Sequence, residues 1–75
     1  MRILITGASG LLGLNTALES ANQHTVFGQV NRNALQTEAF TVLNANLVEP
    51  GAVDRILDRT QPDWVIHCAA LANLE

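Results

Sequence analysis

The chain has 75 residues, of which 48% are hydrophobic and 15% are charged, a composition typical of one small globular domain rather than of a disordered segment. With a net charge of −3 and only scattered arginines, the chain is not expected to bind a nucleic-acid duplex, and no apolar run approaches the ~18 residues of a membrane span. The single cysteine, Cys68, excludes an internal disulfide, and because no secretory signal pattern is present we expect a cytoplasmic protein.

The first predicted element is a short apolar strand over residues 3–5, which runs into a glycine-rich turn and then a helix. Three glycines follow it at intervals of three residues: Gly7, Gly10 and Gly13. The first allows the positive φ of a sharp turn, the second lets the backbone approach a ligand, and the third lets the helix pack close to the strand. The N–H groups of Leu11 and Leu12 and the helix dipole would then face an anion. The pattern predicts a pyrophosphate-binding turn for a dinucleotide, and the alternative is a structural turn that binds nothing.

A helix and a second strand are predicted after this turn. Apolar residues recur at helical spacing at six positions: Leu11, Leu12, Leu14, Ala17, Leu18 and Ala21. They predict a helix over about 10–22, and a β-rich run predicts a strand over 25–30. The polar stretch 31–38 is shorter than an ordinary parallel crossover, so we predict a loop there with at most one helical turn around Ala34 and Leu35.

The second half of the chain is predicted to contain a strand over 39–43, a helix, and a strand over 64–68. Pro50 lies near the first turn of this helix, and its apolar stripe is expected to contain Val53, Ile56 and Leu57. The strands are short apolar runs, as is typical of parallel strands covered on both faces. With right-handed crossovers they predict an α/β fold, the first half of a doubly wound parallel sheet with strand order 3-2-1-4.

Two loops carry residues expected at the adenosine end of a dinucleotide. The loop after the second strand has no acidic residue but contains Arg32, which favours the 2′-phosphate of NADP over NAD; the alternative is a solvated loop arginine. After the third strand, the side-chain oxygen of Asn46 could accept a hydrogen bond from the adenine amino group, while the Leu47 N–H serves a ring nitrogen. The alternative for Asn46 is an ordinary loop or cap asparagine.

The fourth strand ends beside two small residues, Ala69 and Ala70, which are expected to leave room for a flat cofactor. His67 and Cys68 are adjacent on a strand and therefore point to opposite faces, so they are not expected to form a catalytic pair. Trp64 is interpreted as a packing residue. Four charged residues of the second helix are interpreted as its solvated face: Asp54, Arg55, Asp58 and Arg59. No catalytic residue and no metal site are predicted.

Together these motifs resemble the extended short-chain dehydrogenase/reductase family. The resemblance rests on the T-G-x-x-G-x-x-G turn that begins at Thr6, the Asn46-Leu47 step, and the P-D-W-V-I-H-C-A-A run over 62–70. The family commonly has aspartate where Asn46 stands. Within the family, the chain is most similar to the sugar-nucleotide branch, notably dTDP-4-dehydrorhamnose reductases. The resemblance implies a Rossmann-type domain that binds NADP or NAD in an oxidoreductase or epimerase acting on a sugar nucleotide.

The resemblance also implies that 1–75 is a partial, amino-terminal domain without the catalytic and substrate-binding parts. Family members use a downstream Tyr-x-x-x-Lys pair for acid–base chemistry, and this chain has no tyrosine and no lysine. Two alternatives remain: a redox-sensor module that binds NAD(P) without catalysis, and a fragment with no activity of its own. The fourth strand would leave an unpaired edge, which favours association, self-association included.

Overall fold

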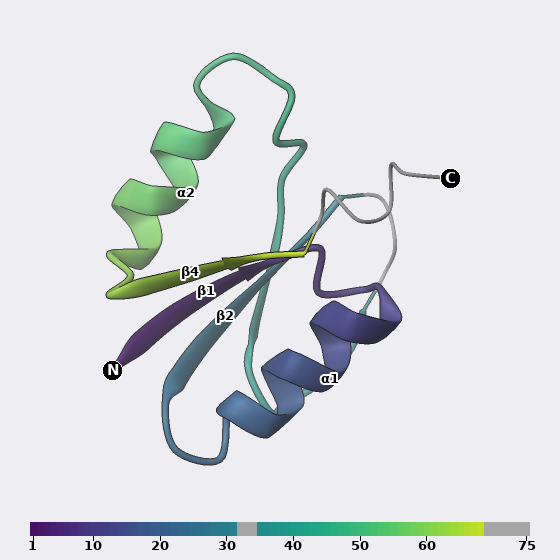
Figure 1. Cartoon of the computed structure of the whole chain (residues 1–75). Coiled ribbons are helices and arrows are strands. Elements are labelled where there is room, and N and C mark those ends of the chain that lie inside the picture. Colours follow the sequence, from purple (N-terminus) through teal and green to yellow (C-terminus); the bar gives the residue numbers. More distant parts are fainter. Residues whose placement is uncertain (32–34, 69–75) are drawn as a thin grey trace.

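The computed structural model describes residues 1–31 and 35–68, which form a four-stranded parallel sheet with one helix on each face (Figure 1). The elements are β1 (Arg2–Thr6), α1 (Leu11–Ser20), β2 (Thr25–Val30), β3 (Thr41–Asn44), α2 (Ala52–Thr60) and β4 (Trp64–His67). The strand order is β3-β2-β1-β4, and every neighbouring pair is parallel. The predicted fold class and strand order are therefore confirmed.

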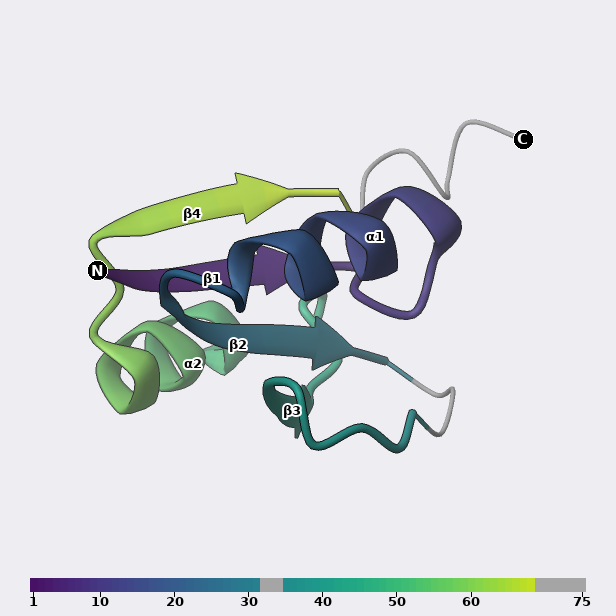
Figure 2. The same ribbon diagram turned by 90° about the horizontal axis from the view of Figure 1, so that it is seen from below.

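The strand register brings the carboxyl ends of the strands to one edge of the sheet. Thr6 at the end of β1 pairs with Gln29 of β2 on one side and with His67 of β4 on the other, and Val30 pairs with Asn44 of β3. Figure 2 shows β4, β1 and β2 side by side with their arrowheads at this edge. The glycine turn and the loops after β2 and β3 consequently meet where parallel α/β sheets bind ligands.

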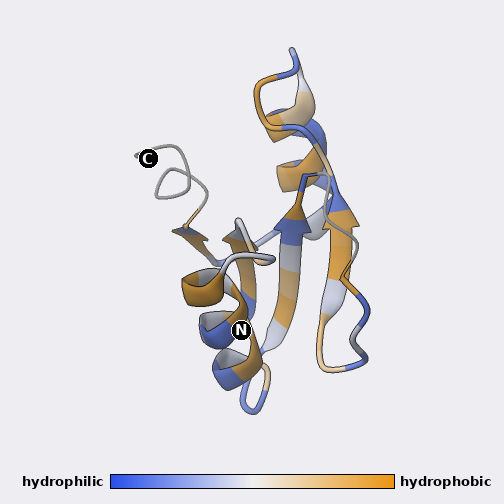
Figure 3. Cartoon of the chain, turned by 90° about the vertical axis from the view of Figure 1, so that its right-hand side faces the viewer, coloured by the Kyte–Doolittle hydropathy of each residue, from blue (hydrophilic) through white to orange (hydrophobic). Residues whose placement is uncertain are grey.

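Alternate residues of β1 supply two apolar layers, because successive strand side chains point to opposite faces. Ile3 and Ile5 belong to a cluster on the α1 side that includes Ala17, whereas Leu4 packs on the other side with Ile56 of α2. Figure 3 shows the sheet between the two helices, with apolar segments along its strands. The sheet is thus buried on both faces only where the two helices lie.

The helix α1 packs through part of the predicted apolar stripe, because Ala17 is buried and Leu14 and Ala21 pack against the core cluster. Its buried residues are Gly13 and Ala17, while Leu11 is 81% exposed and Leu12 and Leu18 are also exposed. Gly13 and Ala17 bring the helix close to the sheet, and three of its four leucines are left exposed. The helical period was predicted correctly, and the part of the stripe that does not pack is Leu11, Leu12 and Leu18.

The helix α2 packs through two residues of its predicted stripe, Ile56 and Leu57, but not through Val53. Ala52, Ile56 and Thr60 are buried, whereas Val53 is exposed. The helix begins at Ala52, after Gly51 adopts a left-handed conformation with φ of 78°. That turn sets the helix phase, so the residues at i, i+4 and i+8 from Ala52 face the sheet.

The strand β3 begins two residues later than predicted and ends one residue later. Phe40 leaves the strand path to pack over Gly28, where an added Cβ would lie 2.5 Å from the Phe40 ring. The predicted turn at Ala34 lies outside the described residues, and Leu35 is not helical. The strand β4 ends at His67, one residue earlier than predicted.

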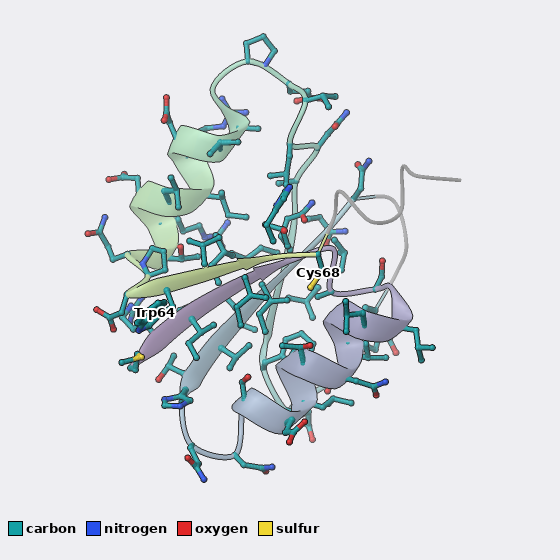
Figure 4. The ribbon with its side chains drawn as sticks, viewed as in Figure 1. Trp64 and Cys68 are labelled. Atoms are coloured by element: carbon teal, nitrogen blue, oxygen red, sulfur yellow. The ribbon has the colours of Figure 1, made fainter. Side chains whose placement is uncertain are left out.

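Trp64 was wrongly predicted to be a packing residue. It begins β4, which is an edge strand in the described part of the chain, and its side chain is 60% exposed (Figure 4). Cys68, just after β4, is buried in the cluster on the α1 side. Neither described helix has the length and apolar character that a membrane crossing requires.

Candidate functional site

The glycine turn after β1 depends on its first and third glycines for its shape. Gly7 has φ of 70°, a conformation that side-chain-bearing residues rarely adopt. A Cβ at Gly13 would overlap the carbonyl oxygen of Gly7 and would contact the Ala8 backbone. Gly13 was expected to let the helix approach the strand. In the structure, its close contact is with the turn itself.

Three amides of this turn are already used inside the protein. The Gly7 N–H donates to Gln29 Oε1 over 2.9 Å, and the Ala8 N–H donates to the Gln29 carbonyl oxygen over 2.9 Å. The Gly10 N–H donates to the Gly7 carbonyl oxygen over 3.2 Å. The donors left for an anion therefore lie farther along, at the start of α1.

The amino terminus of α1 is open to a ligand. Gly10 occupies the N-cap position, and no side chain in the described ranges caps the helix by a hydrogen bond. The first intrahelical bond runs from the Leu14 N–H to the Gly10 carbonyl, so the N–H groups of Leu11 and Leu12 precede the helical ladder. A Cβ at Gly10 would come no closer than 3.5 Å to the Gly7 oxygen. This geometry fits a phosphate group held by helix-terminal amides.

Gln29 is a residue of this site that sequence reasoning missed. It is only 3% exposed, yet both polar atoms of its side chain are bonded: Oε1 to the Gly7 N–H, and Nε2 to the Ala45 carbonyl oxygen over 2.6 Å. A glutamine within the otherwise apolar end of a buried strand was the available signal, because buried amides need two partners.

An open cleft of about 520 Å³ lies between the ends of β2 and β3 and the helix α2. Its lining comes from three places: the end of β2 (Asn31), residues 43–49 (Leu43, Asn44, Ala45, Asn46, Glu49) and α2 (Ala52, Arg55, Ile56, Arg59). The cleft is large enough for a nucleoside and carries several amide and guanidinium groups.

Asn46 lines this cleft, and its Oδ1 accepts a hydrogen bond from the Val48 N–H over 3.2 Å. That bond is the local turn anticipated as the alternative role, and it leaves the second lone pair of Oδ1 for another donor. Leu47 is half-buried against the apolar cluster on the α2 side. The predictions for Arg32, Ala69 and Ala70 fall outside the described residues.

Arg55 and Arg59 were interpreted only as part of a solvated helix face. Both are exposed, but both also line the cleft. The Arg55 guanidinium lies over Gly51, since a Cβ at Gly51 would be 3.1 Å from Arg55 Nη1. It therefore sits at the end of α2 nearest the ligand-binding edge of the sheet, whereas Arg59 lies one turn farther away.

The end of β4 is tied to the end of β1 through Thr6. Thr6 Oγ1 lies 2.6 Å from His67 Nδ1 and accepts a hydrogen bond from the Cys68 N–H over 3.1 Å. His67 is exposed and Cys68 is buried, in keeping with their placement on opposite faces. Within 1–31 and 35–68, no group of histidine, cysteine and carboxylate side chains could hold a metal ion.

The family model described as the RmlD substrate binding domain matches residues 1–75, the whole chain. The chain belongs to this family. A GDP-6-deoxy-D-talose 4-dehydrogenase of Aggregatibacter actinomycetemcomitans is 33% identical over 73 residues, which cover 95% of this chain and 21% of that protein. The methionine adenosyltransferase 2 subunit beta of Mus musculus is 37% identical over 71 residues, which cover 92% and 20%.

This member of the RmlD substrate binding domain family thus spans about a fifth of the length of these curated relatives. Among solved structures, L-threonine dehydrogenase from Clostridium difficile superposes with a TM-score of 0.76 at 22% identity, over 88% of this chain and 23% of that one. At that identity the superposition establishes the α/β fold.

Proposed function

We propose that residues 1–75 are the dinucleotide-binding part of an NAD(P)-dependent enzyme that reduces or epimerises a sugar nucleotide, as dTDP-4-dehydrorhamnose reductases do. The observation that carries the proposal is the amino terminus of α1, which no side chain of the described residues caps and where the Leu11 and Leu12 amides precede the helical ladder. The other amides of the adjoining turn are mostly satisfied within the protein. One relative is a GDP-6-deoxy-D-talose 4-dehydrogenase, which supports a sugar nucleotide as the substrate class.

The proposed roles follow the edge of the sheet. The pyrophosphate would lie against the glycine turn and the Leu11 and Leu12 amides, and the adenosine would occupy the cleft beside Asn46 and Leu47. Arg32 would favour the 2′-phosphate of NADP over NAD. Ala69 and Ala70 would adjoin the ribose side.

When bound, the cofactor supplies the hydride, and these residues bind and orient it. Because the chain has no tyrosine and no lysine, the acid–base pair of the family and the sugar-nucleotide site would belong to other parts of a longer protein.

The test is to titrate the full-length protein with NADPH and with NADH and to measure binding by isothermal titration calorimetry. We expect tighter binding of NADPH, and we expect Gly10→Val to abolish binding of both because its side chain would occupy the space of the pyrophosphate. Asn15→Ala, an exposed change on the same helix, is the control and should leave both affinities unchanged. Tighter NADH binding would contradict the role of Arg32, and unchanged affinity in Gly10→Val would contradict the turn as the phosphate site.

A second candidate is an NAD(P)-binding module without catalysis, acting as a redox sensor. It is favoured by relatives named methionine adenosyltransferase 2 subunit beta, which are described as subunits of a transferase rather than as dehydrogenases. The two candidates differ in the downstream sequence of the longer protein. A Tyr-x-x-x-Lys pair there supports the enzyme, and its absence supports the sensor.

A further inference from the structure

We infer that Gln29 is a positioning residue that sets the separation between the pyrophosphate-binding turn and the adenosine-binding cleft. The inference rests on the proposed function and adds to it a residue that touches no ligand. Gln29 lies at the end of β2, in the middle of the ligand-binding edge, with β1 on one side and β3 on the other.

The side chain of Gln29 connects two loops that belong to different strands. Its Oε1 accepts the Gly7 N–H at the beginning of the glycine turn, and its Nε2 donates to the carbonyl of Ala45, the residue before Asn46. Only one orientation of the amide group satisfies both partners, since one is a donor and the other an acceptor. The glutamine side chain therefore fixes the distance between the glycine turn and the loop that contains Ala45.

The backbone of Gln29 reinforces this connection on the turn side. Its carbonyl oxygen accepts a hydrogen bond from the Ala8 N–H. The first two amides after β1, those of Gly7 and Ala8, therefore both donate to Gln29. The Gly7 carbonyl oxygen in turn accepts the Gly10 N–H, and Gly10 occupies the N-cap position of α1. These backbone bonds do not need the Gln29 side chain, so they hold the turn and the start of α1 by themselves and leave the side chain to fix the distance to the loop at Ala45.

A ligand that bridges two half-sites depends on their separation in a way that its separate pieces do not. For such a ligand the second contact is intramolecular, and its contribution falls when the spacing is not maintained. Adenosine or inorganic pyrophosphate alone needs only its own half-site. ADP, which contains both, needs the spacing that Gln29 maintains.

The experiment compares wild-type, Gln29→Met and Gln29→Asn forms of the full-length protein. Methionine has nearly the same length but no hydrogen-bonding amide, and asparagine keeps the amide but is too short to reach both loops. Gln23→Met, in the exposed turn after α1, is the matched control. Dissociation constants are measured by calorimetry for ADP, adenosine and pyrophosphate, and the Gly7 amide signal is followed by NMR.

We expect both Gln29 variants to weaken ADP binding on the order of tenfold, while adenosine and pyrophosphate affinities stay within about twofold of wild type. The Gly7 amide signal should shift in both variants but not in Gln23→Met. Equal losses for all three ligands would show a general structural role and overturn the inference, as would unchanged ADP affinity. If the wild-type protein binds neither ADP nor NADPH, the proposed function itself fails, before any variant is compared.

Discussion

At the scale of single residues, the glycines of the turn serve different purposes. Gly7 and Gly13 are required by the protein's own geometry, because one has a positive φ and the other lies against the Gly7 carbonyl. Gly10 is not restricted in either way, since its φ is −77° and its surroundings are open. A side chain at Gly10 should therefore affect a ligand more than the fold.

These different roles predict that alanine at Gly13 mainly lowers stability, whereas alanine at Gly10 mainly lowers cofactor affinity. Gly13→Ala should destabilise the protein by roughly 1–3 kcal/mol or more, because backbone atoms must move to admit the new methyl group. Gly10→Ala should change stability by less than that and weaken NADPH binding instead. Urea denaturation and NADPH titration of the full-length variants measure both effects. Equal destabilisation by the two changes would contradict the assignment.

At the scale of elements, close packing between neighbouring segments determines where each strand and helix begins. Phe40 covers Gly28 of β2 and delays the start of β3, and Gly51 sets the phase of α2. Phe40 and Gly51 each lie just before the element whose start they influence, β3 and α2 respectively. Their effect on the site is to place the end of β3 and the first turn of α2 around the same cleft.

The packing of Phe40 predicts the effect of a single methyl group in β2. Gly28→Ala should destabilise the protein by roughly 1–3 kcal/mol, since the new Cβ would lie 2.5 Å from the Phe40 ring and 2.9 Å from the Ala8 Cβ. The double variant Gly28→Ala with Phe40→Leu should recover part of this loss if the ring is the main obstacle. Thermal unfolding measures both variants, and no recovery would indicate that Ala8 dominates.

The helix α2 offers a second prediction, on cofactor affinity. Arg55→Gln should weaken NADPH binding roughly threefold to fivefold, as expected for a solvent-screened charge beside the cleft that would hold the adenosine and its 2′-phosphate. Arg59→Gln is the matched change one turn farther along the cleft and should have a smaller effect. The difference should shrink as salt is raised. Equal effects at all salt concentrations would argue against a phosphate near Arg55.

At the scale of the whole molecule, the described sheet is unevenly covered. β4 is exposed along its full length, with Trp64, Val65 and Ile66 all among the exposed apolar residues, and Leu11 and Leu12 of α1 are exposed as well. Exposed strand edges of this kind pair readily with other chains. A chain of 75 residues is also small enough for its stability to be marginal.

The isolated 75-residue chain should therefore be weakly stable and should self-associate. Trp64 is its only tryptophan, so fluorescence reports on the β4 edge directly. We expect the emission maximum to move to shorter wavelengths as the chain concentration rises, and Ile66→Lys to suppress that shift by placing a charge on the edge. A monomer that unfolds cooperatively at high stability, with emission independent of concentration, would contradict this.

The sequence predicted much of the fold because its signals are local. Short apolar runs, the glycine spacing and helical periodicity sufficed for all six elements and for the strand order, since right-handed crossovers leave few arrangements. The same local signals placed Leu11 and Leu12 at the helix start. Local signals did not predict the exposure of Trp64, because its burial depends on whether another strand pairs with the outer edge of β4.

By itself, then, the sequence determined the sheet, its order and the turn that precedes α1. Only the tertiary structure decided which apolar residues of each helix stay exposed, which amides of the turn are used inside the protein, and that Gln29 joins the turn to the loop at Ala45. The physical reason is that backbone preferences act between near neighbours in the chain. The hydrogen-bond partners of the Gln29 amide and the lack of space for a Cβ at Gly28 depend instead on segments far apart in the sequence. Those segments meet only when the sheet is assembled.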